Sequence, residues 1–391
     1  MFSRLAKISF AALFLSVGFL IGMSVQPSAA QSNVYELDTK AKQMILVDFK
    51  TGTVLSGKNE DEEMYPSSMT KLMTAYLAFE QLKNGTLSLD DTFSVSKKAW
   101  ETGGSKMFVR VDTRVRVEDL LRGIIVQSGN DATIVMAEGL SGSEEAFARK
   151  MTDKARELGM THTNFKNASG LPDPEHYTTA RDLATLAAAL IRNFPEYYHF
   201  YSETEFTFSD ITQQNRNPLL YRDVGVDGLK TGHTEAAGYG LTASAVRNGQ
   251  RLIVVVNGLE STRERAQEPE RILDWGFREF GTFPLFAAGE TVADATVWLG
   301  TEARVPLIVQ EPVSIVMRRA VRDQLQVTLK TQEPIAAPIE PGSVQGELVV
   351  SAPGLDTITV PVVAGEPVER LGSFGRLQSA VQYLVFGESG Q

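Results

Sequence analysis

The sequence predicts a mixed α/β protein in which a helical insertion divides one sheet, followed by a small all-β domain. Strand-like runs occur at both ends of the first part of the chain, and amphipathic helical patterns occupy the interval between them. Past Thr282 the pattern changes to short alternating runs with frequent Pro and Gly. A chain of 391 residues is long enough for two domains. We expect these to span residues 31–282 and 283–370.

The first expected element is a β-hairpin. Gln43–Val47 and Thr53–Leu55 are short apolar runs on either side of a Gly-containing turn. A helix is expected next, because five apolar residues recur at i, i+3, i+4, i+7 and i+8: Met69, Leu72, Met73, Tyr76 and Leu77. Pro66 suits the approach to its first turn and Asn84-Gly85 ends it. Ser68 then lies at the helix N-terminus, with Lys71 one turn later on the same side.

The remaining helices and strands are predicted from the period at which apolar residues recur, which is about 3.6 residues in a helix and two in a strand. We expect helices over residues 117–126, 132–139, 144–158, 180–193 and 270–280, with a loop over 167–177. Strands are expected at 206–208, 228–230, 240–246 and 251–256. In the small β domain, residues 313–315 and 325–329 alternate apolar and polar side chains. Glu144-Glu145 is expected to lie on a solvated helix face.

Ser68 and Lys71 form a Ser-x-x-Lys pattern, which is suited to covalent catalysis. A serine hydroxyl is a poor nucleophile until a base takes its proton, and a lysine can do so if burial lowers its pKa toward neutrality. The helix N-terminus favours a developing oxyanion. The same pattern occurs at Ser94 to Lys97, where Gly103-Gly104 soon follow and no long helix is expected. The pattern therefore needs support from other motifs.

Two further motifs supply that support. Ser128-Gly129-Asn130 lies between two expected helices, and Lys230-Thr231-Gly232 lies on an expected strand. Ser-x-x-Lys, Ser-x-Asn and Lys-Thr-Gly in this order are the signature of penicillin-binding proteins and class A β-lactamases. Ser128 can relay a proton and Asn130 can bind a substrate amide. Lys230 and Thr231 can bind a carboxylate, and Gly232 lets substrate approach the strand closely. Lys50-Thr51-Gly52 precedes the serine and is interpreted as a hairpin turn.

The chain resembles the low-molecular-mass penicillin-binding D-alanyl-D-alanine carboxypeptidases. The similar stretches lie at residues 68–71, 127–132, 179–183, 215–217, 226–234 and 275–277. The resemblance implies a β-lactamase/transpeptidase-like catalytic fold. It also implies an oxyanion hole formed by the backbone N–H groups of Ser68 and His233, and carboxylate binding by Arg265, assisted by Arg216. The family usually ends in a small β domain and an amphipathic helix.

The expected reaction is removal of the terminal D-Ala from peptidoglycan stem pentapeptides through an acyl-Ser68 intermediate, with β-lactams as covalent inhibitors. A DD-endopeptidase that cuts cross-linked muropeptides would need nearly the same site. A β-lactamase is a third possibility, but no Glu-x-x-Leu-Asn stretch occurs between Asn130 and Lys230. A non-catalytic scaffold is a fourth, and labelled penicillin would leave a scaffold unmarked.

Composition and charge argue against several other kinds of function and site. The formal charge of −10 and the lack of a basic block argue against a nucleic-acid partner. There is no cysteine, which excludes disulfides and thiol nucleophiles. His162, His176 and His199 lack metal-ligand spacing, and we expect neither a metal nor a cofactor.

The two ends of the chain indicate export. Residues 1–30 combine Arg4 and Lys7, an apolar run and a Ser-Ala-Ala cleavage site, which is typical of a signal peptide; an uncleaved anchor is the alternative. In the 371–391 tail, five apolar residues share one helical face: Leu371, Phe374, Leu377, Val381 and Leu384. This tail is too short and too polar to span a bilayer. We expect a periplasmic protein held on the outer face of the cytoplasmic membrane by this tail.

Overall fold

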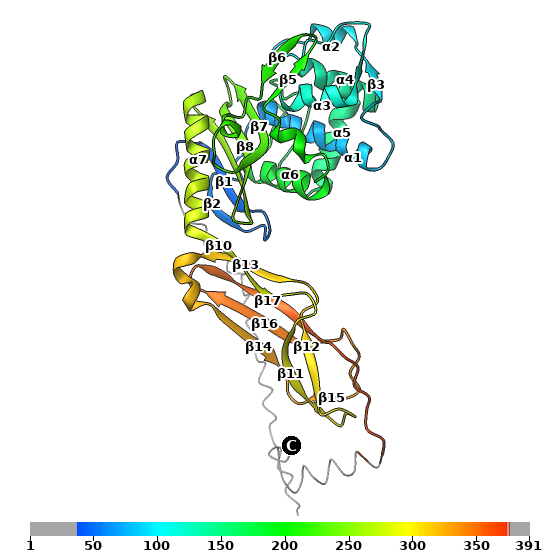
Figure 1. The fold of residues 1–391 in the computed structure, drawn as a ribbon, viewed down its shortest axis with the longest axis vertical. Helices are drawn as coiled ribbons and strands as arrows, with labels where there is room; N and C mark the ends of the chain where they lie inside the picture. Colours follow the sequence, from blue (N-terminus) through cyan, green and yellow to red (C-terminus); the bar gives the residue numbers. More distant parts are fainter. Residues whose placement is uncertain (1–36, 374, 376–391) are drawn as a thin grey trace, which may run out of the picture. The chain divides into compact units, whose positions relative to one another are not determined.

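The computed structural model describes residues 37–373 and residue 375 (Figure 1). The expected signal peptide at 1–30 and nearly all of the amphipathic tail lie outside the described residues. Among the helices that the structure describes, none has both the length and the apolar character needed to cross a bilayer.

A five-stranded antiparallel sheet forms the centre of the first part of the chain, with strand order β2-β1-β9-β8-β7 (Figure 1). β1 (Gln43–Asp48) and β2 (Val54–Lys58) precede the helical insertion. β7 (Val226–Thr234), β8 (Gly238–Arg247) and β9 (Gln250–Leu259) follow it. The expected division of one sheet by an insertion is confirmed, because β1 pairs directly with β9.

The sheet is buried on both faces, and successive side chains along its strands point alternately into the two cores. Ile253 and Val255 of β9 join the core shared with α1 and α6, whereas Leu252 and Val254 join the core beneath α7. α6 (Ala180–Asn193) and α7 (Thr262–Glu279) therefore cover opposite faces, as Figure 1 shows. β7 lies at one edge of the sheet, so it pairs with a neighbouring strand on one side only.

The insertion consists of helices and two small hairpins. Besides α6, its helices are η1 (Ser67–Thr70), α1 (Lys71–Lys83), α2 (Lys97–Glu101), α3 (Val117–Ile125), α4 (Asn130–Ser141), α5 (Glu144–Glu157), η2 (Tyr198–Ser202) and η3 (Pro218–Tyr221). The hairpins pair β3 (Thr92–Ser94) with β4 (Arg114–Arg116), and β5 (Glu205–Phe208) with β6 (Ile211–Gln214). Side-chain caps begin α5 and α6, where Ser143 Oγ and Thr179 Oγ1 accept from the third residue of each helix.

α7 begins at Thr262, eight residues before the expected start at Glu270. Pro269 lies inside the helix, and a proline normally marks a helix boundary because it lacks an N–H donor. The true start is set by Ser261, whose Oγ accepts from the N–H of Glu264. β7 is also longer than expected and includes the whole Lys-Thr-Gly motif.

The C-terminal region is all β, as expected. A six-stranded sheet has the order β14-β16-β17-β12-β11-β15, and β10 pairs separately with β13 (Figure 1). Its own core includes Val305, Leu307, Val350 and Val362. The strands are β10 (Phe280–Phe286), β11 (Thr291–Trp298), β12 (Arg304–Ile308), β13 (Val313–Arg318), β14 (Gln326–Thr331), β15 (Ile335–Ala336), β16 (Val344–Ala352) and β17 (Leu355–Ala364), with η4 (Arg319–Gln324) after β13.

Candidate active site

Ser68 lies in the single 3₁₀ turn η1, directly before α1. Lys71 is the first residue of α1, and its Nζ lies 3.1 Å from Ser68 Oγ. Ser68 is partly exposed, whereas Lys71 is buried. The second Ser-x-x-Lys pattern is different, since Ser94 ends a short strand, Lys97 begins a one-turn helix, and both are exposed. The structure thus separates the two patterns by their surroundings.

Two oxygens that can only accept hydrogen bonds hold Lys71 in place. Its Nζ lies 2.8 Å from Asn130 Oδ1 and 2.7 Å from the carbonyl oxygen of Ser169. The orientation of the Asn130 amide is fixed independently, because its Nδ2 donates to the Gly103 carbonyl. A neutral amine has two N–H donors and one lone pair. When both N–H bonds point to these acceptors, the lone pair is directed to the Ser68 hydroxyl.

The surroundings of Lys71 favour the neutral amine. Burial lowers its pKa to about 7, and the nearby Arg216 charge acts in the same direction, while Asp131 opposes both. A pKa near neutrality is what a general base needs at physiological pH, because a large fraction is then unprotonated. Lys71 therefore combines the position and the protonation state required to activate Ser68.

Ser128 lies across the site, in the connection between α3 and α4. Its φ of 59° is left-handed, a conformation that non-glycine residues seldom adopt and that occurs at functional sites. Lys230 Nζ donates to Ser128 Oγ at 3.0 Å and to the Thr231 carbonyl at 3.2 Å. Burial, followed by the charges of Lys71, Arg216 and Arg265, holds the pKa of Lys230 well below its usual value. Ser128 accepts from Lys230, so its own proton is free to be donated elsewhere.

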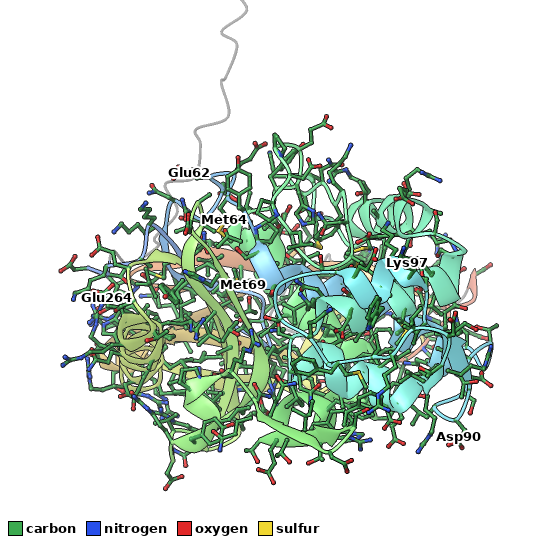
Figure 2. The ribbon with its side chains drawn as sticks, turned by 90° about the horizontal axis from the view of Figure 1, so that it is seen from above. Glu62, Met64, Met69, Asp90, Lys97 and Glu264 are labelled. Carbon is green, nitrogen blue, oxygen red and sulfur yellow. The ribbon has the colours of Figure 1, made fainter. Side chains whose placement is uncertain are left out.

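The nucleophile turn packs tightly against β7. A Cβ atom on Gly232 would lie 2.9 Å from the Pro66 carbonyl oxygen, so glycine is needed for this approach. Ser67 Oγ and Thr234 Oγ1, 3.2 Å apart, join the same two elements. In Figure 2, Met69 lies between the sheet and the helical region, and its Sδ accepts from Thr242 Oγ1 of β8. These contacts fix Ser68 beside the exposed edge of the sheet.

Three further residues were expected at the site, namely His233, Arg265 and Arg216. His233 is exposed and stacks on Tyr239 with ring centroids 3.9 Å apart. The Arg265 guanidinium lies 5.3 Å from the Tyr239 ring centroid, and its Nε has no hydrogen-bond partner among the described residues. Arg216 donates to Ser105 Oγ. Burial lowers the pKa of both arginines.

Four basic side chains thus lie around the site, namely Lys71, Lys230, Arg216 and Arg265. Their charges are close enough to influence one another's pKa values. Within the part of the chain that the structure describes, no carboxylate forms an ion pair with any of them. An anionic group of the substrate would supply the missing negative charge.

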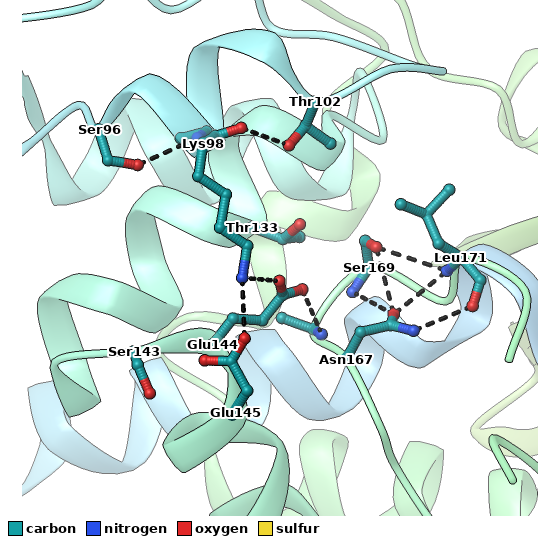
Figure 3. A network of polar contacts seen from close by, with 12 residues as sticks. Ser96, Lys98, Thr102, Thr133, Ser143, Glu144, Glu145, Asn167, Ser169 and Leu171 are labelled. Atoms are coloured by element: carbon teal, nitrogen blue, oxygen red, sulfur yellow. Dashed lines mark hydrogen bonds and ion pairs between the residues drawn. The ribbon is translucent and has the colours of Figure 1, made fainter.

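The loop expected over 167–177 carries Ser169, and its contact with Lys71 was not expected from the sequence. Asn167 Oδ1 accepts from the N–H groups of Ser169, Gly170 and Leu171 and so shapes this turn (Figure 3). Glu144 anchors it too, which makes the expectation of a solvated Glu144 wrong. Glu144 is buried, its Oε1 accepts from the N–H of Ala168, and its carboxylate pairs with Lys98 (Figure 3).

Both parts of the chain match known families. Residues 28–261 match the family model described as D-alanyl-D-alanine carboxypeptidase, peptidase family S11. Residues 280–370 match the model of the penicillin-binding protein 5 C-terminal domain. Together these matches include both regions that the structure shows as separate cores.

Individual relatives agree over most of their length. The chain is 39% identical to the D-alanyl-D-alanine carboxypeptidase DacC of Escherichia coli strain K12, over 92% of each chain. It is 37% identical to the D-alanyl-D-alanine carboxypeptidase DacA of Haemophilus influenzae, over 99% of each chain.

Solved structures give the same result. Penicillin-binding protein 5 from Haemophilus influenzae is 36% identical and has a TM-score of 0.80, covering 86% of this chain and 100% of its own. Penicillin-binding protein D2 from Listeria monocytogenes, solved in its ampicillin-bound form, is 30% identical with a TM-score of 0.57, covering 62% of this chain and 98% of its own. The chain therefore belongs to the D-alanyl-D-alanine carboxypeptidase family of serine peptidases.

Proposed function

We propose that this protein removes the terminal D-Ala from peptidoglycan stem pentapeptides through an ester formed on Ser68. The observation that carries the proposal is the buried Lys71, held by two acceptor oxygens so that its lone pair is directed to Ser68 Oγ. The family match and the named activity of the relatives support the same reaction. No metal or cofactor is needed for any step.

In the acylation step, Lys71 Nζ takes the proton of Ser68 Oγ. The oxygen then attacks the carbonyl carbon of the peptide bond between the last two D-Ala residues. The backbone N–H groups of Ser68 and His233 stabilise the resulting oxyanion. The tight contact between η1 and β7 at Gly232 supports this pairing, because it brings residue 233 beside the nucleophile turn.

The C–N bond then breaks, and the leaving amine needs a proton. Ser128 donates it, since its hydroxyl accepts from Lys230 and keeps its own proton available. Lys71, now protonated, restores the proton to Ser128. For hydrolysis, Lys71 takes a proton from water, the hydroxide attacks the ester carbonyl, and Ser68 leaves with the proton.

Substrate recognition depends on the basic side chains around the site and on β7 at the edge of the sheet. Lys230, Thr231 and Arg265 bind the free carboxylate of the terminal D-Ala, assisted by Arg216, and Asn130 contacts the substrate amide. The arriving carboxylate restores the charged form of Lys230, whose pKa burial otherwise depresses. β-Lactams occupy the same place as covalent inhibitors, consistent with the ampicillin-bound relative.

A pentapeptide carboxypeptidase is favoured over the alternatives. The two relatives described above are both named carboxypeptidases. No Glu-x-x-Leu-Asn stretch, the deacylation motif of class A β-lactamases, occurs between Asn130 and Lys230. An endopeptidase would differ only in accepting a larger leaving group.

We further propose that the protein is exported by its residues 1–30 and works in the periplasm, held on the membrane by the 371–391 tail. The apolar stripe of the tail and its position after a complete β domain support this. The tail contains a single basic residue, Arg376, so its binding rests on apolar burial rather than on charge.

Digestion of purified pentapeptide muropeptides, followed by mass analysis, tests the reaction. The wild type should release one alanine per stem and produce tetrapeptides, and Ser68→Ala should release none. Cleavage of cross-linked dimers at a higher rate than monomers would favour the endopeptidase instead.

A further inference from the structure

His176 is a buried group that the mechanism above does not use. Its side chain is 2% exposed, and it lines a cavity of about 220 Å³ beside the nucleophile turn. Both ring nitrogens have partners. Nε2 lies 2.8 Å from Thr70 Oγ1, and Nδ1 lies 3.1 Å from the backbone nitrogen of Lys166.

These two contacts determine the state of the ring. The Lys166 N–H can only donate, so Nδ1 must be the unprotonated nitrogen. Nε2 then bears the single proton and donates it to Thr70. Burial lowers the pKa of His176 to about 4, and Lys71 acts in the same direction while Asp173 opposes it, so the ring is neutral at physiological pH. His176 is therefore a neutral connector with one donor and one acceptor.

His176 joins two elements that both contact the base. Thr70 directly precedes Lys71, at the end of the nucleophile turn. Lys166 begins the segment that carries Ser169, whose carbonyl accepts from Lys71. His176 itself lies at the far end of this segment. One side chain thus fastens both ends of the 166–176 segment to the turn that carries the nucleophile.

The nucleophile turn and the 166–176 segment are in close contact at Gly170. A Cβ atom on Gly170 would lie 1.7 Å from the Ser67 carbonyl oxygen and 2.8 Å from Thr70 Oγ1. A small movement of the segment would therefore displace the Ser169 carbonyl from Lys71. One of the two acceptors that direct the lone pair would then be lost, and water would reach the amine.

We propose that His176 is a positioning residue for Lys71. It holds the Ser169 carbonyl against the nucleophile turn and so keeps the base aligned with Ser68. The proposal rests on the proposed function of Lys71. It does not involve substrate contact, because the ring nitrogens of His176 are hydrogen-bonded to Thr70 and Lys166.

The test measures the rate of Ser68 acylation by a labelled penicillin, as a function of pH, in His176 variants. His176→Phe keeps the ring volume and removes both hydrogen bonds. His176→Gln can keep the contact with Thr70, since its amide reaches where Nε2 lies. His162→Gln is the matched control, because His162 is exposed and its Nδ1 contacts the neighbouring Thr161 Oγ1 rather than the nucleophile turn.

We expect His176→Phe to slow acylation about tenfold, the effect of losing a buried hydrogen bond that aligns a reacting group. Its pH profile should move to higher pH, because a lysine reached by water regains its preference for the charged form. KM for a pentapeptide should change less than twofold. His176→Gln should recover most of the rate, and His162→Gln should match the wild type.

Three results would contradict the inference. They are a folded His176→Phe that acylates within twofold of wild type, a pH profile that does not move, or a rate loss in His176→Gln as large as in His176→Phe. A wild type that takes no label overturns the proposed function and this inference with it. A labelled wild type with an unaffected His176→Phe overturns the inference alone.

Discussion

Gly170 lies where the 166–176 segment crosses the nucleophile turn, and it can be substituted to test that contact. Its φ of 83° is left-handed, and an added Cβ would lie 1.7 Å from the Ser67 carbonyl oxygen. Gly170→Ala must therefore move the turn or the segment. We predict a fall in the acylation rate of about 10²-fold, the cost of a displacement of about 1 Å at reacting groups. Labelled penicillin measures the rate.

Gly159→Ala is the matched control for this substitution. Gly159 has the same φ of 83°, but no atom lies within 4 Å of the Cβ position. The control should lose about 1–3 kcal/mol of unfolding free energy to backbone strain, measured by chemical denaturation, and should keep its acylation rate. Equal acylation rates in the two variants would show that the crossing does not position the nucleophile.

Active-site groups that are side chains can be predicted from sequence more readily than active-site groups that belong to the backbone. The sequence pointed to four reactive side chains because they belong to three motifs that occur in a fixed order along the chain: Ser68, Lys71, Ser128 and Lys230. Ser169 could not be singled out, because it contributes a backbone carbonyl that any residue type would provide. Asn130 was expected to contact substrate, and only the structure shows that its Oδ1 also holds Lys71.

At the scale of elements, helices with a strong apolar period were the easiest to place. α1 ends at Lys83, directly before the Asn84-Gly85 stop, and α6 runs over the expected 180–193. α7 begins at Thr262 rather than at the expected Glu270 and includes Pro269, a residue type that normally marks a helix boundary. β7 was expected near 228–230 with the Lys-Thr-Gly motif on it, and the structure extends the strand to Val226–Thr234 although it contains two glycines, which strands usually lack.

The 371–391 tail is the element whose proposed role can be tested directly. A protein that ends at Arg370 should keep its carboxypeptidase activity and move from the membrane pellet to the soluble fraction. Binding by the intact tail should persist at high salt, because apolar burial is not screened by ions. Fractionation at low and high salt measures both expectations.

Two outcomes would contradict the proposed anchor. A mature full-length protein that is already soluble would show that the tail does not bind membranes. A truncated protein that unfolds its β domain would show that the tail belongs to the core instead. Circular dichroism of the truncated protein distinguishes the second outcome from simple release.

At the scale of the whole molecule, the sequence pattern identified the five strands of the central sheet but could not supply their order. The sequence indicates that strands lie on both sides of the helical insertion. That β1 pairs with β9 rather than with β7 depends on which apolar faces meet when the chain closes. The consequence is functional, because this order leaves the Lys-Thr-Gly strand at an open edge beside the nucleophile turn.

The local charge around the active site also becomes visible only in the folded molecule. The chain has a formal charge of −10, yet four basic side chains lie around Ser68. Motifs pointed to Lys71 and Lys230 and the family resemblance to Arg216 and Arg265, but only the folded chain shows that all four are close enough to affect one another's pKa values. Burial, and after it the neighbouring positive charges, depress the pKa values of Lys71 and Lys230, and a substrate carboxylate would offset those charges.

The central claim is that a neutral, buried Lys71 activates Ser68. The most direct test is the pH dependence of acylation by labelled penicillin, with the labelled residue identified by peptide mapping. The unprotonated amine is the active form, and its fraction rises with pH. The rate should therefore rise through a midpoint near pH 7, the value to which the pKa of Lys71 is lowered.

The label should lie on Ser68, and Lys71→Arg should acylate about 10²-fold more slowly or worse, because guanidinium stays protonated. A label on Ser94 would contradict the account. So would a rate that rises only near the ordinary lysine pKa of 10.5, or a Lys71→Arg variant that acylates at the wild-type rate.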